Sequence, residues 1–306
     1  MWGYLSKRVW QGAISILGAS IIIFMISRLS GDPILMLLPN DATPAMITEA
    51  RRTHGLDRPL WVQYGIWVEK AVTGDFGRSY RWEMPALQLI LDRLPATIEL
   101  AVFGLLFSVA IAVPVGVLSA VNRGGWVDRV GRVFAMLGQA MPAFWVGLLL
   151  ILVFAIHLNW LPAFGYGSPS HVILPAIALG WYPVAAQTRI VRSAMLDVLD
   201  SDHVRLSRAL GTPERLIVWK YALRNAAVPL LTMLGVYFAA MLGGAFVVET
   251  IFAWPGVGRT VVEAVFSRDF PVVQAGVLFT SILFVLSNLL VDLSYGLVDP
   301  RIRDAR

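Results

Sequence analysis

No cysteine occurs among the 306 residues of this sequence. Disulfide bonds, thiolate metal sites and cysteine nucleophiles are therefore excluded. The histidines are few and scattered, without the spacing of metal ligands: His54, His157, His171 and His203. We interpret them as interfacial or loop residues and expect no metal site.

Charged residues are also scarce. Only 15% of the residues are charged, whereas about a quarter is typical of a soluble domain. Hydrophobic residues make up 57% of the chain and the mean hydropathy is +0.69, which predicts an integral membrane protein. A net charge of +5 would also fit nucleic-acid binding. Because the basic residues are spread over short segments between apolar runs, we attribute them to orientation in the bilayer and expect no nucleic-acid partner.

The motifs of enzymes are missing as well. The sequence has no nucleophile elbow, no H-E-x-x-H and no paired carboxylates, and it lacks the phosphate-binding pattern G-x-x-x-x-G-K-[ST]. Serines within the apolar runs, such as Ser15, Ser20 and Ser108, are interpreted as helix-packing residues. We predict no catalytic residue, no enzyme activity for the chain alone and no cofactor bound to it.

Six apolar runs are present, each long enough to cross about 30 Å of hydrocarbon. They are Val9–Ser27, Thr97–Val121, Val133–Ile156, Val172–Ile190, Ala226–Ile251 and Val272–Val298. Pro175, Gly180 and Pro183 interrupt the fourth run, which a membrane helix tolerates when neighbouring helices satisfy the freed backbone groups. The sequence thus predicts an all-α membrane protein with six transmembrane helices. The fourth of them is expected inside a packed bundle.

Lys7 and Arg8 give the first run the positive flank of a signal peptide. The run is too long for such a signal, however, and no small-x-small cleavage site closes it. We therefore predict an uncleaved span.

Lysine and arginine are distributed asymmetrically around the runs. One side holds Lys7, Arg8, Arg123, Arg129, Arg132, Arg189, Arg192, Arg205, Arg208, Arg215, Lys220, Arg224, Arg301, Arg303 and Arg306. On the other side, outside the long segment after the first run, only Arg259 and Arg268 occur. Long loops count little toward orientation, so this asymmetry predicts that both termini are cytoplasmic.

The segment between the first two runs is expected outside the cell. Thr43 and Pro44 are typical of an N-cap followed by the first residue of a helix. A second short helix begins near Pro59 and carries aromatic residues suited to a membrane interface: Trp61, Tyr64 and Trp67. Two interpretations stay open: a small cap packed on the bundle, or a docking surface for an external partner.

Ionisable residues avoid the middles of the spans. Glu99, Arg189, Glu249 and Asp292 all lie near span ends. A proton- or sodium-coupled transporter usually needs acidic groups at mid-depth, which disfavours a secondary transporter. A passive channel would need a filter motif, and none is visible. A pathway-forming subunit driven by another protein fits better, and a scaffold without transport activity is a further alternative.

The cytoplasmic stretch VRLSRALGTPERLIVWK, residues 204–220, is charged and sharply broken. We predict a short helix from about His203 to Leu210, ended by Gly211 in a left-handed conformation. Thr212 and Pro213 then begin a second helix as N-cap and first residue. The first helix can be capped by any of Asp200, Ser201 or Asp202. Its apolar side chains fit two alternatives equally, a hairpin on the membrane surface or a docking element.

The same stretch, extended to DHVRLSRALGTPERLIVWKYALRNAAVPLLTMLG, resembles the cytoplasmic motif of ABC-importer permeases, in the version of the dipeptide/oligopeptide family. Other segments along the chain resemble that family too: GDP at 31–33, GLDRPLWVQY at 55–64, GDFGRS at 74–79, RLPATIEL at 93–100, FWVGLLLI at 144–151, FAWPGVGR at 252–259 and DPRIR at 299–303. One departure is Leu206, because related permeases commonly carry a small residue there. Its bulk affects how closely this helix can approach a partner.

The resemblance implies a type I importer permease and its partners. A second, similar permease encloses the pathway, two cytoplasmic ABC ATPase subunits bind ATP and magnesium, and an external substrate-binding protein delivers the solute. The membrane would be the plasma membrane, or the inner membrane of a Gram-negative bacterium. The expected division is an N-terminal span at 1–29, an external segment at 30–94, a permease core at 95–300 and a tail at 301–306.

Residue roles follow from the resemblance. The coupling helix, at about 202–211, would contact an ATPase through Val204, Arg205, Leu206, Ser207, Arg208, Ala209, Leu210 and Gly211. Gly235, Gly243 and Gly244 are candidates for lining the pathway or for ordinary helix packing. Trp254, Pro255 and Gly256 are candidates for an external gate or a binding-protein contact. Peptide is the expected solute, and glutathione, nickel complexes and other small solutes are the alternatives.

Overall fold

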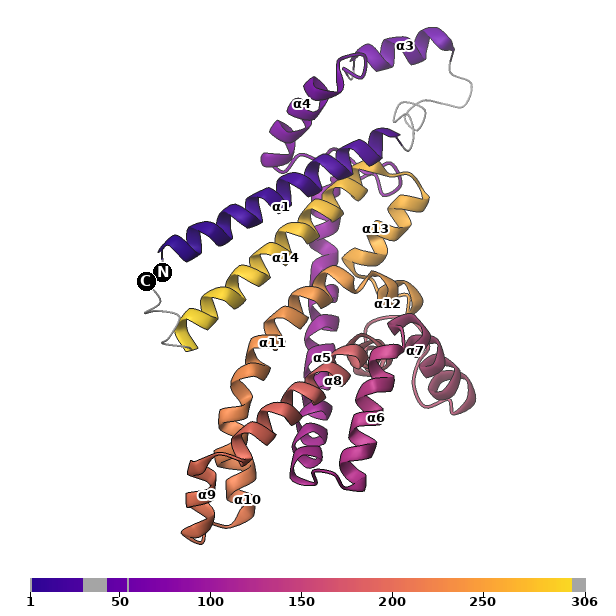
Figure 1. The fold of residues 1–306 in the computed structure, drawn as a ribbon. Helices are drawn as coiled ribbons and strands as arrows, with labels where there is room; N and C mark the ends of the chain where they lie inside the picture. The colour runs from indigo at the N-terminus through magenta and orange to yellow at the C-terminus, as the bar shows by residue number, and fades with distance from the viewer. Residues whose placement is uncertain (1, 30–42, 54, 299–306) are drawn as a thin grey trace. The chain divides into compact units, whose positions relative to one another are not determined.

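The computed structural model describes residues 2–29, 43–53 and 55–298, with side chains for 6–29, 43–49, 51–53 and 55–291. The described chain is nearly all helical (Figure 1). Its elements are α1 (Trp2–Leu29), α3 (Pro44–Thr53), α4 (Leu60–Val72), α5 (Ala86–Val121), α6 (Trp126–Ala140), α7 (Ala143–Leu150), the π-helix η1 (Ile151–His157), α8 (Pro169–Leu199), α9 (Asp202–Ala209), α10 (Glu214–Leu216), the π-helix η2 (Ile217–Ala222), α11 (Leu223–Gly244), α12 (Phe246–Ile251), α13 (Val257–Phe266) and α14 (Phe270–Val298). The predicted tail at 301–306 and the segment 31–33 lie outside the described residues.

The chain divides into two compact units. Unit 1 comprises residues 1–97 and 255–289, and unit 2 comprises residues 98–254 and 290–306. Both α5 and α14 contribute to each unit, because the division falls within these helices.

Among the described residues, four helical stretches are long and apolar enough to cross a membrane: Ser6–Leu29, Ala86–Val121, Glu214–Gly244 and Phe270–Val291. They correspond to the predicted first, second, fifth and sixth spans, with shifted ends. The second starts at Ala86 rather than Thr97, so the last residues of the predicted external segment are helical. The helix of the fifth ends at Gly244, because the chain turns at Ala245 before α12.

The predicted third span, Val133–Ile156, is wrong as a single straight helix. It is instead a pair of helices, Trp126–Ala140 and Ala143–His157, bent by 105° at a short break, and the pair would make one further span. The break holds Met141 and Pro142, both with extended backbone, at ψ 120° and 144°. A proline disfavours helical backbone at the residue before it, which explains why α6 ends there.

The predicted fourth span corresponds to α8, which continues through Pro175 and Pro183. This helix is not among the four stretches that are apolar enough to cross by length and composition. Many of its residues are nevertheless buried, and it packs against α6, α7 and α11 within unit 2. α8 also approaches α5 closely, because a Cβ on Gly180 would lie 2.5 Å from the carbonyl oxygen of Gly104 on α5.

The core of unit 1 brings the N-terminal helices together with α13 and α14. Its buried residues are Ile23, Ala86, Leu89, Ile90, Val257, Ala264, Val272, Val273 and Ala275. α4 joins this core through its aromatic side chains. The Tyr64 ring meets the Phe24 ring edge-on at 5.4 Å, and the Trp67 indole Nε1 donates a hydrogen bond to Gln274 Oε1 at 2.9 Å. The segment before α5 therefore packs on its own unit.

The predicted starts of the two short helices in this segment are confirmed. α3 begins at Pro44, and the Thr43 hydroxyl accepts a hydrogen bond from the Met46 amide at 3.4 Å. α4 begins at Leu60, directly after Pro59.

Candidate functional site

α9 is the central element of the predicted coupling segment, and its ends are set by local backbone geometry. Ser201 is the N-cap residue, with extended backbone, but its hydroxyl bonds to the Val198 carbonyl rather than to the helix amides. At the other end, Gly211 has a φ of +77°. The Gly211 amide donates to the Arg208 carbonyl at 3.0 Å and the Thr212 amide donates to the Ser207 carbonyl at 3.1 Å. This is a Schellman ending, so the predicted left-handed conformation of Gly211 at the end of the helix is confirmed.

The start of the second helix differs from the prediction by one residue. Pro213, not Thr212, is the N-cap residue, and α10 begins at Glu214. Pro213 has a ψ of 134°, so its backbone is still extended. The first helical turn passes into the π-helix η2 and then into α11, and together they form a helical stretch that is long and apolar enough to cross a membrane.

Val204 anchors α9 to the rest of unit 2. Its side chain is fully buried, in a cluster that includes Met195 of α8 and Ile217 of η2. Leu206 and Leu210 are 61% and 76% exposed. Because they are four residues apart in a helical segment, their side chains lie on the same face. Of the predicted coupling residues, Val204 therefore holds the helix in place, while the leucine pair presents apolar surface.

The other predicted coupling residues are polar or small. Arg205, Arg208 and Ala209 are exposed, and Ser207 is half-buried. Arg208 forms two hydrogen bonds to the Glu214 carboxylate, from Nε at 3.1 Å and from Nη2 at 2.7 Å. This carboxylate raises the pKa of Arg208. The ion pair spans the Gly211 turn and fixes α9 relative to α10.

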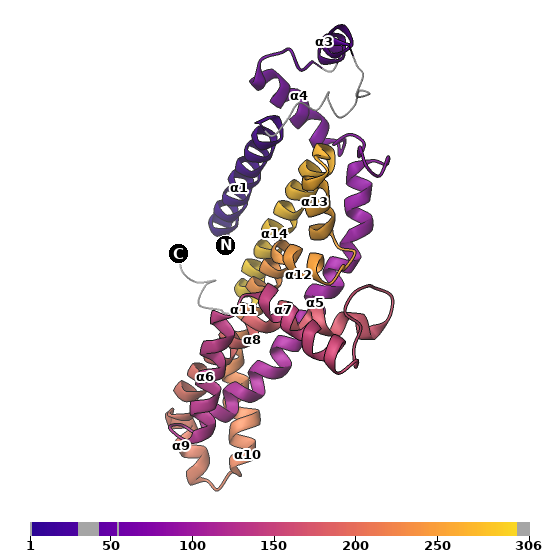
Figure 2. The same cartoon turned by 90° about the vertical axis from the view of Figure 1, so that its right-hand side faces the viewer.

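α9 lies at the end of unit 2 where α5 ends and α6 begins, as both views show (Figures 1 and 2). An ion pair of 3.1 Å joins Arg123, in the turn after α5, to Asp200, directly before α9. A second ion pair joins α6 to α8. The buried Asp128 carboxylate accepts two hydrogen bonds from Arg192 of α8, at 2.6 and 2.9 Å, and one from the Gly124 amide at 3.0 Å. These contacts attach the α9 end of α8 to the start of α6.

The Asp128–Arg192 pair was not found by reading the sequence. Asp128 follows Gly124 and Gly125 at the start of a helix, where an acidic residue is an ordinary helix-dipole partner. The sequence gives no sign that an arginine 64 positions away reaches it. Only the packing of α6 on α8 brings the two together.

The three candidate pathway glycines have different surroundings. A Cβ on Gly235 would lie 2.0 Å from Val291 Cγ2, so this glycine permits close contact between α11 and the last part of α14. A Cβ on Gly244 would meet no atom within 4 Å, and both Gly243 and Gly244 are exposed. The helix packing interpretation therefore fits Gly235. Gly243 and Gly244 instead end α11, just before the turn at Ala245.

The candidate external gate is not an exposed surface in this structure. Trp254 is 1% exposed, and Gly256 is buried. Trp254 belongs to unit 2, where its ring meets Tyr166 edge-on at 4.8 Å. Pro255 and Gly256 belong to unit 1, where α13 begins directly after Gly256. In this conformation neither Trp254 nor Gly256 offers side-chain or backbone surface to a partner.

Trp254 and Tyr166 also line a hollow of about 780 Å³ in unit 2. The rest of its lining comes from the middle of α5, the start of α8 and the loop before it: Glu99, Phe103, Leu106, Phe107, Ala110, Gly167, Ser168, Pro169, Val172, Ile173, Ala176 and Ile177. The Tyr166 hydroxyl donates a hydrogen bond to Glu99 Oε2 at 2.8 Å. This bond to the carboxylate raises the pKa of Tyr166. The sequence identifies Glu99 as an ionisable residue near a span end, but it does not reveal its hydrogen-bond partner Tyr166.

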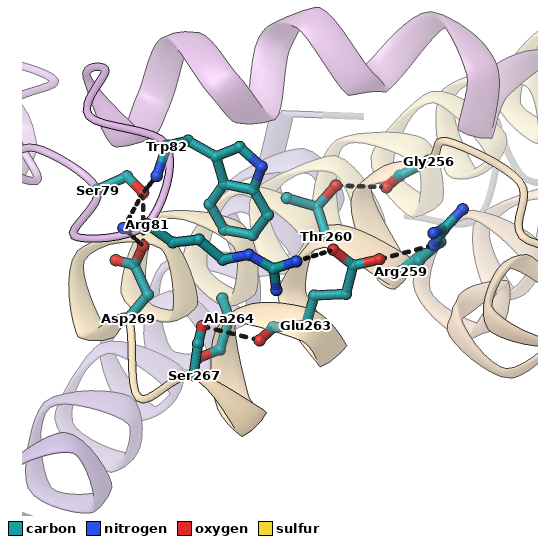
Figure 3. A network of polar contacts seen from close by, with 10 residues as sticks. All are labelled: Ser79, Arg81, Trp82, Gly256, Arg259, Thr260, Glu263, Ala264, Ser267 and Asp269. Carbon is teal, nitrogen blue, oxygen red and sulfur yellow. Dashed lines mark hydrogen bonds and ion pairs between the residues drawn. The ribbon is translucent and has the colours of Figure 1, made fainter.

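A polar network in unit 1 orders the turn before α5 (Figure 3). Asp269 is fully buried, and its Oδ2 accepts hydrogen bonds from the Ser79 hydroxyl and, at 3.2 Å, from the Arg81 amide. The Ser79 oxygen in turn accepts a hydrogen bond from the Trp82 amide at 2.8 Å. The loop before α14 thereby fixes the backbone of residues 79–82.

Charged side chains extend this network along α13 (Figure 3). The Glu263 carboxylate pairs with Arg259 at 2.8 Å and with Arg81 at 3.6 Å. The Arg81 guanidinium also lies over the Trp82 ring, 4.8 Å from its centroid. The arrangement is a rigid support with no free nucleophile, so we assign it a structural role. Across the described residues, no group of three His, Asp or Glu side chains could hold a metal ion.

Comparison with known proteins identifies close relatives. Residues 112–304 match the family described as "Binding-protein-dependent transport system inner membrane component", and residues 1–101 match the corresponding N-terminal family. The dipeptide transport system permease protein of Alkalihalophilus pseudofirmus is 39% identical over 332 residues, covering 99% of this chain and 100% of that protein. The glutathione transport system permease protein of Escherichia coli (strain K12) is 38% identical over 304 residues, covering 99% of each. A solved structure titled "Crystal structure of an amino acid ABC transporter with histidines" is 20% identical, with a TM-score of 0.48, and covers 67% of this chain and 92% of its own.

Proposed function

Since this chain belongs to the family of binding-protein-dependent transport system inner membrane components, we propose that it is the permease subunit of an ATP-driven importer for dipeptides or oligopeptides. The observation that carries the proposal is the 39% identity to a dipeptide permease over essentially the whole of both chains. Glutathione is the second candidate solute, because a glutathione permease is nearly as similar.

The proposed topology has six spans with both termini in the cytoplasm. Four spans are the apolar stretches of α1, α5, α10–α11 and α14, and the bent pair from α6 to η1 is the fifth. We assign α8 as the sixth. It is too polar to qualify by composition, but its burial by α6, α7 and α11 is the environment in which a span can hold prolines and polar residues. The basic residues around α9 then face the cytoplasm, and the segment from α3 to α4 faces outward.

α9 is proposed as the element that docks on a cytoplasmic ATPase. Three features support this role: the exposed pair Leu206 and Leu210, the buried anchor Val204, and the stiff turn closed by Gly211 and the Arg208–Glu214 ion pair. A movable loop would absorb a force applied by the ATPase. A short helix fixed to α8 and η2 transmits it to the membrane-spanning helices instead.

Transport would proceed by alternating access between two permeases. Closure of the ATP-bound ATPases, which hold the ATP and magnesium, moves the α9 helix of each permease and opens the pathway outward. The external binding protein then releases its solute into the pathway, and hydrolysis restores the inward-open state. The chain's own contributions are α9, the close contact of α11 with α14 at Gly235, and the breaks at Ala245 and at residues 254–256, where a gate could move.

Reconstitution tests the proposal. The chain is placed in vesicles with its companion permease, its ATPases and its binding protein, and uptake of radiolabelled dipeptide and of radiolabelled glutathione is measured. We expect solute to accumulate only when ATP is present on the ATPase side. Uptake driven by a proton or sodium gradient without ATP would instead establish a secondary transporter. If no solute crosses the membrane under any condition, the chain would be a scaffold without transport activity.

A further inference from the structure

The lining of the hollow between α5 and α8 is mostly apolar and carries charge of only one sign. Its lining, given above, consists almost entirely of apolar side chains, and among these described residues there is one carboxylate and no lysine, arginine or histidine. Its volume of about 780 Å³ falls in the range of ordinary small-molecule sites. A solute that fits this lining carries a single positive charge on an apolar body.

Glu99 can accept that charge. A carboxylate has about four acceptor positions, and the bond from Tyr166 to Oε2 uses one of them. The Tyr166 bond also fixes the direction in which the carboxylate faces, which lowers the cost of ordering it when a ligand arrives. Glu99 is half-buried and lines the hollow, so a ligand in the hollow can reach it.

Aromatic rings supply the second element of recognition. Phe103 and Phe107 of α5 and Tyr166 line the same hollow, and the Trp254 ring, itself 1% exposed, supports the Tyr166 ring edge-on. Aromatic faces attract ammonium groups, and this attraction is strongest where the cation is partly desolvated. The same rings provide apolar surface for a side chain next to the ammonium group.

We propose that this hollow binds the protonated amino terminus and first side chain of a peptide, with Glu99 as the ammonium acceptor. The proposal rests on peptide import as the proposed function and adds a contact made by the permease itself. The carboxyl end of the peptide is not selected here, because the lining offers no basic partner for it. The site therefore distinguishes a free amino terminus from a blocked one.

A single cysteine makes the test direct, because the chain has none of its own. Ser168 lines the hollow at an exposed loop position, so Ser168→Cys is introduced and the complete importer is reconstituted in phosphatidylcholine vesicles. The rate of maleimide labelling is measured with phenylalanylalanine or with N-acetyl-phenylalanylalanine present. We expect the free dipeptide to slow labelling and the acetylated one to have no effect at the same concentration.

Variants of Glu99 identify the acceptor. Glu99→Gln is expected to raise the half-protecting concentration of phenylalanylalanine about tenfold or more, since a hydrogen bond to a charged group is lost. Glu99→Asp keeps the charge and should restore part of the protection. Glu69→Gln, on an exposed part of α4 outside the hollow, is the matched control and should leave protection unchanged.

Three outcomes would overturn the assignment: equal protection by both dipeptides, no protection by either, or protection that survives Glu99→Gln. Adding phosphatidylethanolamine tests the competing source of an ammonium group. If this lipid slows labelling in a Glu99-dependent manner while the dipeptide has no effect, the site belongs to a lipid headgroup. ATP-dependent dipeptide uptake, measured on the same vesicles, keeps failure of this site distinct from failure of the proposed function.

Discussion

Leu206 and Leu210 are large apolar side chains that lie exposed on a short helix whose position is already fixed. Burying one such side chain is worth about 1.5–3 kcal/mol, or roughly 10- to 150-fold in affinity. We expect Leu206→Ala to weaken association with the ATPase by up to about tenfold, because other contacts remain. Leu206→Asp should weaken it further by placing an unpaired carboxylate in the contact.

Association is measured by co-purification and by light scattering with the isolated ATPase. Leu158→Ala is the control, since Leu158 is also exposed but lies just after η1, far along the chain from α9. If the Leu206→Asp variant binds the ATPase as tightly as the unchanged protein does, α9 is not a docking element but part of a hairpin on the membrane surface.

Substitutions of Gly211 test the turn that ends α9 rather than the contact with the ATPase. The φ of +77° at Gly211 strains any residue with a Cβ, and β-branched residues most, although the surrounding space is open. Gly211→Val should therefore cost about 1–3 kcal/mol locally and uncouple ATP hydrolysis from dipeptide uptake. Gly211→Asn, which tolerates this backbone, should retain most of the coupling. Equal uptake by the two variants, at equal ATPase activity, would contradict a role for this turn.

At the scale of elements, the Asp128–Arg192 ion pair joins α6 to α8. Asp128 is 1% exposed and Arg192 is 23% exposed, so removing the acid leaves a charge in a partly dry site. We expect Asp128→Asn to destabilise the protein by about 3 kcal/mol, the lower end for breaking a buried pair. Thermal unfolding in detergent should show a clearly lower midpoint. Asp200→Asn removes an exposed pair with Arg123 and should change stability by less than about 1 kcal/mol.

The contact between α11 and α14 depends on the absence of a side chain at Gly235. Gly235→Ala places a methyl group 2.0 Å from Val291 Cγ2, which requires the helices to move apart. The expected cost is about 1–3 kcal/mol. Gly244→Ala meets open space and should be tolerated. A stable Gly235→Ala protein with altered solute selectivity would instead favour a pathway-lining role for this glycine.

Several elements were predictable from the sequence because their causes are local. The Gly211 turn, the Thr43–Pro44 start and the four strongly apolar spans follow from backbone preference and hydropathy alone. The bend at Pro142 was missed because apolar residues continue on both sides of it, so hydropathy shows one run. Contacts such as Tyr166 with Glu99 could not be found, since they depend on how helices distant in sequence pack.

At the scale of the whole molecule, the orientation of the chain in the membrane can be tested by labelling single cysteines. Ser79, in the proposed external segment, would be a poor site because it is buried and bonded to Asp269. Thr73 and Arg215 are both exposed. We expect an impermeant maleimide added to intact cells or spheroplasts to label Thr73→Cys and not Arg215→Cys. Labelling of Arg215→Cys from outside, before the membrane is opened, would reverse the orientation.

α8 contributes Val172, Ile173, Ala176 and Ile177 to the hollow at its beginning, and it ends at Leu199, with two residues between it and α9. One helix therefore carries the proposed solute contact and leads into the proposed ATPase contact. Thermodynamic linkage makes such an arrangement reciprocal: any factor by which ATPase docking changes solute affinity is the factor by which solute changes docking affinity. A dipeptide titrated into the reconstituted permease would then report on the ATPase at the far end of α8, without any nucleotide being hydrolysed.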